Sequence, residues 1–156
     1  IVEHNTFFQL GIPLSPGNDS ANSKNTGLYW RNNIHWHNDY GILGAGVGTG
    51  NPTLNGYFTS PVYLGNAMVE QQFPASYPAG NFDPANLAAV GFTGVSDRFG
   101  AGTDWSLTGG SSLHNAGTDG TDVGINWSTV QTETSIAVGG IPGSGCHMRV
   151  GRVCGP

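Results

Sequence analysis

The sequence predicts an all-β fold in which coils of short parallel strands stack on one another, and three observations support this prediction. The first is composition: the 156 residues include 26 glycines and 9 prolines, which favour tight turns over helices. The second is that 37% of the residues are hydrophobic and only 10% are charged, so the chain can bury a core and fold as one domain. The third is an internal repeat in the N-terminal half.

The repeat is an asparagine with apolar or aromatic residues on both sides, and it occurs three times. Asn5, Asn33 and Asn66 fall in one column, at spacings of 28 and 33 residues. The aligned segments are residues 1–8, 29–36 and 62–69. The neighbouring columns contain Val2, Trp30 and Tyr63 upstream and Phe7, His35 and Met68 downstream. Because a single coil cannot bury its apolar face, stacked coils with an asparagine ladder at one corner explain this pattern.

The segments between the repeats are assigned from their composition. Residues 11–27 and 44–61 are rich in Gly, Pro, Ser and Asn and are predicted to be loops, and residues 37–41 (HNDYG) are predicted to be a turn. The alternative fold is an antiparallel sandwich. It is less favoured, because the hairpin signals Asn-Gly and Asp-Gly occur only once each.

The C-terminal part of the chain has a different pattern. Residues 1–126 are predicted to form the coils and a cap that closes them, whereas residues 127–156 are predicted to be a C-terminal strand followed by a Gly-rich tail. Cys146 and Cys154 can close a loop in that tail. Such a bond would order the tail and not the core.

Three longer motifs resemble a known family. They are similar to the closing coils and C-terminal cap of right-handed parallel β-helix proteins of the pectate-lyase-like type, many of them secreted by bacteria. The motifs are YWRNNIHWHNDYGILGAG, YPAGNFDPANLAAVGF and WSLTGGSSLHNAGTDGTDVG. The residues of the last motif that match are Leu107, Ser111, Asn115, Gly117, Asp119, Asp122 and Gly124. The resemblance covers residues 1–126 and implies that the chain is a fragment of a longer solenoid.

Pectate lyases and polygalacturonases are the better-known enzymes of this family, and their catalytic carboxylates are not visible in this chain. Asp119 and Asp122 are interpreted as turn residues that cap backbone amides. Ser111 and His114 are interpreted as structural residues of the cap motif. Whether the chain is an enzyme is left open; if it is one, the resemblance implies a carbohydrate-active hydrolase or lyase.

Charge and hydropathy narrow the range of partners. The net charge is −5 with only five Lys and Arg residues, so no basic stripe exists for a nucleic acid, and neutral glycans are favoured over anionic ones. No apolar run approaches the length of a membrane span. The polar, Gly-rich composition and the two C-terminal cysteines are typical of exported proteins, so a secreted, extracellular location is expected.

Aromatic residues in the repeat region indicate a glycan-binding function. Trp30, Trp36, Tyr40 and Tyr63 lie on neighbouring coils in the predicted fold, and outward-facing aromatic rings can stack on sugar rings. The sequence therefore predicts an extracellular module that recognises or processes polysaccharide.

The His-Trp-His sequence raises the alternative of a copper or zinc site. His35 and His37 would share one face if the strand continued through both residues, and His4 or His114 is a candidate third ligand. The competing interpretation places His35 in the core column of Phe7 and Met68, with His37 in the following turn. This interpretation is preferred, so no cofactor is expected.

The remaining alternative is a structural or adhesive module that works by self-association. Ile1–Phe8 would form a first coil with an unpaired edge, and unpaired strand edges attract other chains. A homo-oligomer formed through this N-terminal edge, closed and not filamentous, is therefore expected.

Overall fold

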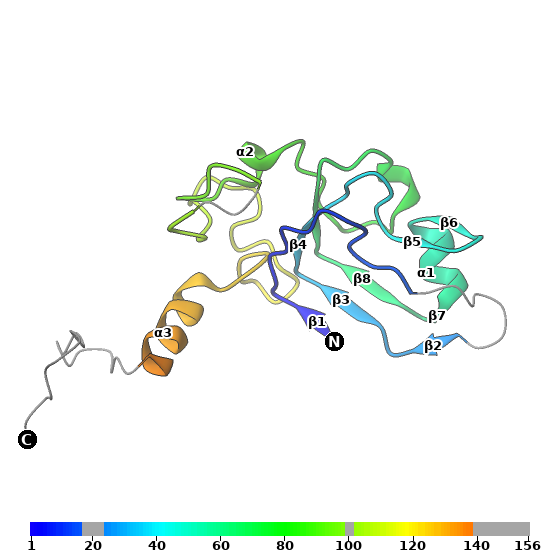
Figure 1. Ribbon diagram of the computed structural model, residues 1–156, viewed down its shortest axis with the longest axis horizontal. Helices are drawn as coiled ribbons and strands as arrows, with labels where there is room; N and C mark the ends of the chain where they lie inside the picture. Colours follow the sequence, from blue (N-terminus) through cyan, green and yellow to red (C-terminus); the bar gives the residue numbers. More distant parts are fainter. Residues whose placement is uncertain (17–23, 99–101, 139–156) are drawn as a thin grey trace, which may run out of the picture. The chain divides into compact units, whose positions relative to one another are not determined.

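The computed structural model describes residues 1–16, 24–98 and 102–138, in which all secondary-structure elements are short (Figure 1). The strands are β1 (Val2–Glu3), β2 (Asn25–Thr26), β3 (Tyr29–Arg31), β4 (Ile34–Trp36), β5 (Leu43–Gly44), β6 (Gly48–Thr49), β7 (Phe58–Thr59), β8 (Val62–Leu64) and β9 (Ala67–Val69). The helices are α1 (Asn51–Tyr57), the 3-10 helix η1 (Pro74–Ser76), α2 (Leu87–Val90) and α3 (Trp127–Ala137). None of the helices in these ranges has the length and apolar character that crossing a membrane requires.

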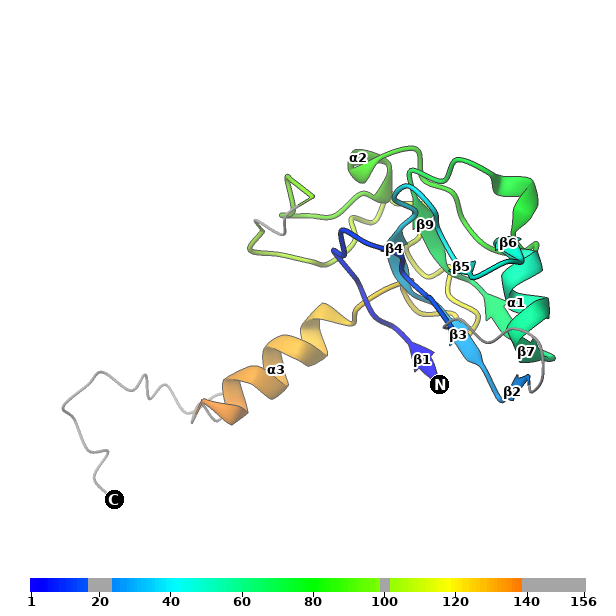
Figure 2. The same ribbon diagram turned by 45° about the vertical axis from the view of Figure 1, so that its right-hand side comes forward.

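The strands form small separate sheets. β1, β3 and β8 make a three-stranded parallel sheet, and β4 and β9 make a two-stranded parallel one (Figure 2). β2 pairs with β7 in parallel, whereas β5 and β6 form an antiparallel hairpin.

The register of the repeat is confirmed. Val2 lies opposite Trp30, and Trp30 lies opposite Tyr63 in the first sheet. His35 lies opposite Met68 in the second. The columns read from the sequence are therefore rows of neighbouring residues across parallel strands.

The predicted right-handed parallel β-helix is wrong, because the sheets in the described ranges contain only two or three strands and do not continue into a solenoid. Residues 44–61, predicted to be a loop, contain the antiparallel hairpin and α1. Pro52 stands in the first turn of this helix, where proline fits, and Leu54 and Tyr57 are buried from it. A linker with its own hairpin and helix does not act as the simple turn that a coil requires.

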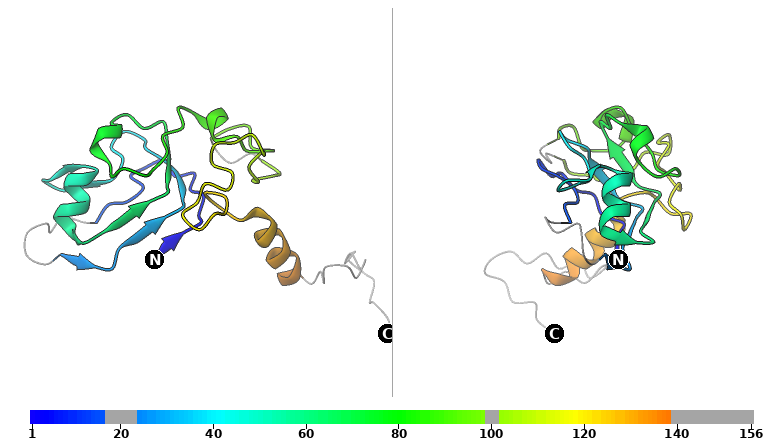
Figure 3. Two further views of the ribbon diagram at one scale, coloured as in Figure 1. Left: turned by 180° about the vertical axis from the view of Figure 1, so that it is seen from behind. Right: turned by 90° about the vertical axis from the view of Figure 1, so that its right-hand side faces the viewer.

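The segment predicted to form the C-terminal cap also differs from the prediction. Residues 105–124 form turns and loops, and they pack against one face of the β4–β9 sheet instead of adding a strand to it. Ile34 and Trp36 contact Leu113 and Val123 in this core, together with Ala67, Val69, Val90 and Leu107. Seen from behind, these loops and α1 lie at opposite ends of the part of the chain formed by Ile1–Ile125 (Figure 3).

The opposite face of the β4–β9 sheet borders a second core. Met68 points there because side chains alternate between the faces of a strand. The buried members of this core are Trp30, Ile42, Leu54, Tyr63, Met68 and Tyr77. The β4–β9 sheet thus separates two hydrophobic clusters and is buried on both sides.

The chain divides into two compact units, Ile1–Ile125 and Asn126–Pro156. The predicted C-terminal strand is wrong: Trp127–Ala137 is the helix α3. Asn126 explains its start, because its side chain accepts a hydrogen bond from the backbone N–H of Thr129 at 3.0 Å. This N-cap and the absence of Gly and Pro over eleven residues outweigh the strand preference of Thr and Val. The Gly-rich tail with Cys146 and Cys154 lies outside the described residues.

Candidate functional site

The predicted asparagine ladder is present. The backbone N–H and the Nδ2 of Asn5 both donate to Oδ1 of Asn33, at 3.0 and 3.1 Å. The same two groups of Asn33 donate to Oδ1 of Asn66, both at 3.0 Å. Asn33 and Asn66 are fully buried, whereas Asn5, at the end of the ladder, is only half-buried.

The ladder has a fourth member, Asn81, which the sequence analysis missed. Asn66 donates to Oδ1 of Asn81 from its backbone N–H and its Nδ2, at 2.9 and 3.1 Å. The residue before each ladder asparagine has a positive φ; these residues are His4, Asn32, Gly65 and Gly80. The Gly-Asn pair at 80–81, which repeats the pair at 65–66, is the signal that could have found the fourth member.

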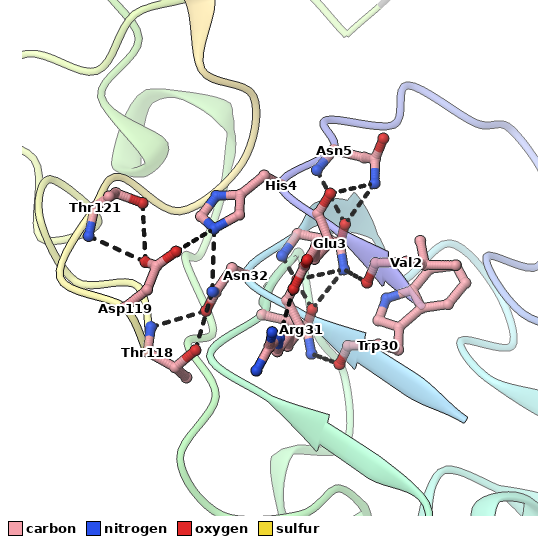
Figure 4. A network of polar contacts seen from close by, with 12 residues as sticks. Val2, Glu3, His4, Asn5, Trp30, Arg31, Asn32, Thr118, Asp119 and Thr121 are labelled. Carbon is pink, nitrogen blue, oxygen red and sulfur yellow. Dashed lines mark hydrogen bonds and ion pairs between the residues drawn. The ribbon is translucent and has the colours of Figure 1, made fainter. Parts of the chain in front are cut away.

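A polar network joins β1 and β3 to the loop of residues 117–124 (Figure 4). His4 lies at its centre: Nε2 is 2.8 Å from Oδ2 of Asp119, and Nδ1 is 3.2 Å from the carbonyl oxygen of Gly124. The buried Asn32 side chain completes it, because Nδ2 donates to Oγ1 of Thr118 and Oδ1 accepts from the backbone N–H of the same residue. Nε2 of His4 also lies 3.2 Å from Nδ2 of Asn32, so both ring nitrogens have polar partners and the imidazole fastens the loop.

The interpretation of Asp119 and Asp122 as turn residues is confirmed. Oδ1 of Asp119 accepts the backbone N–H and the hydroxyl of Thr121, and these bonds, with a smaller contribution from His4, lower the pKa of the carboxyl group to about 2. Asp122 accepts the backbone N–H of Asn115. Both carboxylates therefore accept hydrogen bonds from nearby backbone amides, as turn residues do.

Ser111 and His114 do not form a catalytic pair. The hydroxyl of Ser111 donates to the carbonyl oxygen of Val90 at 2.7 Å, and Nδ1 of His114 lies 2.7 Å from Asp122. Each group has a structural partner, as the sequence analysis expected.

His35 is fully buried and neutral near pH 7. Its Nε2 lies 2.8 Å from the hydroxyl oxygen of Tyr63, and its ring stands edge-on to Trp30. Burial, with a smaller contribution from the nearby His37, lowers the pKa of His35 to about 4. The side chain is therefore a polar member of the core beside Met68, as the preferred interpretation stated.

His37 is also buried, in the turn that follows β4. Its Nδ1 is 2.7 Å from the carbonyl oxygen of Asn38, and its Nε2 has no partner within the described residues. Gly41 fits closely between this ring and Tyr77: a Cβ at Gly41 would lie 1.9 Å from the Tyr77 hydroxyl oxygen and 2.7 Å from Nε2 of His37. Tyr77 itself accepts the backbone N–H of Ile42.

Gly41→Ala is expected to destabilise the protein by about 2 kcal/mol or more, because the methyl group meets Tyr77 and the backbone has a φ of 59°. Gly46→Ala is the matched control, since Gly46 also has a positive φ but has open space around its Cβ position. The control is expected to cost about 1 kcal/mol. Chemical denaturation measures both, and equal losses would contradict the close fit around Gly41.

The geometry does not favour a metal at His35 and His37. Nε2 of His35 is bonded to Tyr63, and His4, a candidate third ligand, is held by Asp119. His114, the other candidate, is held by Asp122. Across the described ranges, no three His, Cys, Asp or Glu side chains come together in a way that could hold an ion.

Most of the predicted glycan-binding aromatic residues are core residues. Trp30, Trp36 and Tyr63 expose 7%, 0% and 4% of their surface. Trp36 is covered by Phe8, with ring centroids 4.7 Å apart, and by the guanidinium of Arg98, 5.7 Å from its ring. Their ring faces are not available to a sugar. Tyr40, by contrast, is 58% exposed.

A second exposed aromatic residue, Phe73, lies on the turn next to that of Tyr40. Phe73 is 53% exposed, and its ring centroid is 5.9 Å from that of His37. The two turns also meet where Nε2 of Gln72 donates to the carbonyl oxygen of Asn38 at 3.4 Å. We call Asn38, Tyr40, Gln72 and Phe73 the Tyr40–Phe73 surface. Phe73 lies beyond the last aligned repeat, residues 62–69, so the repeat does not single it out.

Comparison of the chain with protein-family models, with curated proteins and with solved structures finds no match. The resemblance to pectate-lyase-like proteins therefore stays a prediction.

Proposed function

We propose that this chain is a non-catalytic module that binds a neutral extracellular polysaccharide through the Tyr40–Phe73 surface. The observation that carries the proposal is the exposure of two aromatic rings, 58% for Tyr40 and 53% for Phe73, on two turns that contact each other. Aromatic faces stack on the apolar faces of sugar rings, and a stretched polysaccharide can span two such rings.

An amide group beside the rings supplies the polar part of such a site. Gln72 is exposed next to Phe73, and its Nε2 donates to the carbonyl oxygen of Asn38 on the adjacent turn. The side-chain amide of Asn38 is directed inward, since Nδ2 donates to the carbonyl oxygens of Gln9 and Gly11 and Oδ1 is buried. Amide oxygens and N–H groups match the hydroxyl groups of a sugar, which both donate and accept.

Charge favours a neutral ligand. Asp39 and Glu70 are exposed on the same two turns, and Glu70 is 3.6 Å from Arg98, so the nearby cation already has an anionic partner. A polysaccharide with carboxylate groups would be repelled by the acidic residues.

Tyr40→Ala and Phe73→Ala are each expected to weaken binding to a neutral polysaccharide by about tenfold, because each removes one stacking ring. Affinity gel electrophoresis of the full chain in a series of neutral polysaccharides measures the loss. The melting temperature should change little, because both side chains are exposed.

Tyr29→Ala is the matched control, since Tyr29 is also exposed, at 43%, but begins β3. Its retardation should equal that of the wild type. If the wild type is not retarded in any gel, or if all three variants behave alike, the proposed function is wrong. Release of new reducing or unsaturated sugar ends would show catalysis and would also contradict the proposal.

A further inference from the structure

The start of α3 carries an acceptor pattern for a covalent modification. Residues 126–128 have the sequence NWS, which matches the N-x-Ser/Thr pattern of asparagines that receive sugars in secreted proteins. The same pattern occurs at residues 18–20, which lie outside the described residues. Residues 51–53 have an asparagine and a threonine at the same spacing, but Pro52 stands between them, and the pattern excludes proline there.

The side-chain amide of Asn126 is exposed, and its two ends are used differently. Oδ1 accepts the backbone N–H of Thr129 at 3.0 Å and the hydroxyl of Ser128 at 2.9 Å. Among the described residues, none accepts a hydrogen bond from Nδ2. The oxygen is thus held by the first turn of α3, whereas the nitrogen, the atom to which a sugar would be attached, has no structural role.

The hydroxyl that the pattern requires is already next to this amide. Ser128 is exposed, and its hydroxyl donates to Oδ1 of Asn126. The site at Asn51 differs in this respect as well, because Thr53 is buried and its hydroxyl donates to the carbonyl oxygen of Gly48. Only the site at the start of α3 therefore combines an exposed amide with an exposed hydroxyl in contact with it, within the ranges that the structure describes.

We propose that Asn126 is an acceptor site for an N-linked glycan. In the transfer, a bond forms between Nδ2 of Asn126 and the anomeric carbon of a sugar that is carried as a phosphate ester of a lipid. The bond between that carbon and the phosphate oxygen breaks, the phosphate leaves with the electron pair, and one proton of Nδ2 passes to a base of the transferase. The donor and the transferase belong to a secretory compartment, so the site is used when the chain is secreted. This modification goes beyond polysaccharide binding and does not depend on it.

The attached sugar is compatible with the helix. The modified side chain is still an amide, so Oδ1 of Asn126 continues to accept the N–H of Thr129 and the N-cap of α3 is kept. No residue of α3 is buried, so a bulky hydrophilic group at its first turn displaces no core side chain of this helix.

Secretion of the full chain from yeast, behind a removable leader peptide, tests the proposal. Mass spectrometry of proteolytic peptides should find hexose-containing adducts on Asn126, and an N-glycosidase should remove them. Ser128→Ala should abolish the adduct, because alanine has no hydroxyl, although the bond from Thr129 to Asn126 is kept; Ser128→Thr should retain it. Asn55 is the internal control, since it is an exposed asparagine on α1 without the pattern and should stay unmodified.

A secreted chain without sugar on Asn126 overturns the proposal, as does a Ser128→Ala variant that is modified as fully as the wild type. The melting temperature of the modified wild type should not lie below that of the unmodified chain produced in bacteria, and a lower value would contradict a sugar placed on an intact cap. Ser128→Ala should be retarded like the wild type in gels of neutral polysaccharide, so this proposal and that of the Tyr40–Phe73 surface fail independently.

Discussion

Lowering the pH from 7 to 4 is expected to reduce the free energy of unfolding by about 3 kcal/mol through His35 alone. The pKa of His35 is about 4 in the folded protein, because burial disfavours the charged ring, against 6.5 for an unburied histidine. Between about pH 4 and pH 6.5, His35 is therefore protonated in the unfolded chain but not in the folded chain. The stabilisation is complete above pH 6.5 and is lost as the pH falls from about 6.5 to about 4.

His35→Gln isolates this effect, because glutamine can still form a hydrogen bond with the Tyr63 hydroxyl but does not titrate. Urea denaturation of both proteins between pH 7 and pH 4 measures the difference. The wild type should be the more stable protein at pH 7, and its advantage should shrink by about 3 kcal/mol at pH 4. Parallel curves for the two proteins would show that His35 is not kept neutral by burial.

Asn33→Asp is expected to destabilise the protein by about 3 kcal/mol or more at pH 7. Nδ2 of Asn33 donates to three acceptors: the carbonyl oxygens of Val2 and Arg31 and Oδ1 of Asn66. A carboxylate cannot donate to any of them, and it places a negative charge among oxygens in a fully buried position.

Asn55→Asp is the control for Asn33→Asp, because it makes the same chemical change on the exposed side of α1 and should cost less than about 0.5 kcal/mol. Thermal or chemical unfolding measures both variants. The destabilisation caused by Asn33→Asp should diminish at low pH, where the new carboxyl group can take up a proton and donate one bond. A loss below about 1 kcal/mol at pH 7 would contradict a buried ladder.

The candidate site can be predicted from the sequence only in part. The sequence identifies Tyr40 as an aromatic residue in a turn, and this residue is exposed. The same reasoning selects Trp36, which is covered by Phe8 and Arg98 from distant parts of the chain. Alternation along a strand tells which side chains share a face, but it does not tell whether another segment covers that face.

The sequence by itself determined the register of the parallel strands and the ladder of Asn5, Asn33 and Asn66. Both can be read from the alignment because the asparagine recurs at one position of successive strands, with apolar or aromatic residues in the neighbouring rows. It also determined the turn role of Asp119, which depends on bonds to a residue only two positions away.

Only the tertiary structure decided how the linkers and the later loops are used. Residues 44–61 have loop composition, yet the burial of Leu54 and Tyr57 stabilises a helix there. Residues 105–124 could have continued the parallel pairing, but Leu113 and Val123 instead cover the apolar face of Ile34 and Trp36. The stability of these arrangements comes from apolar contacts between residues far apart in sequence, and neither composition nor local spacing reports such contacts.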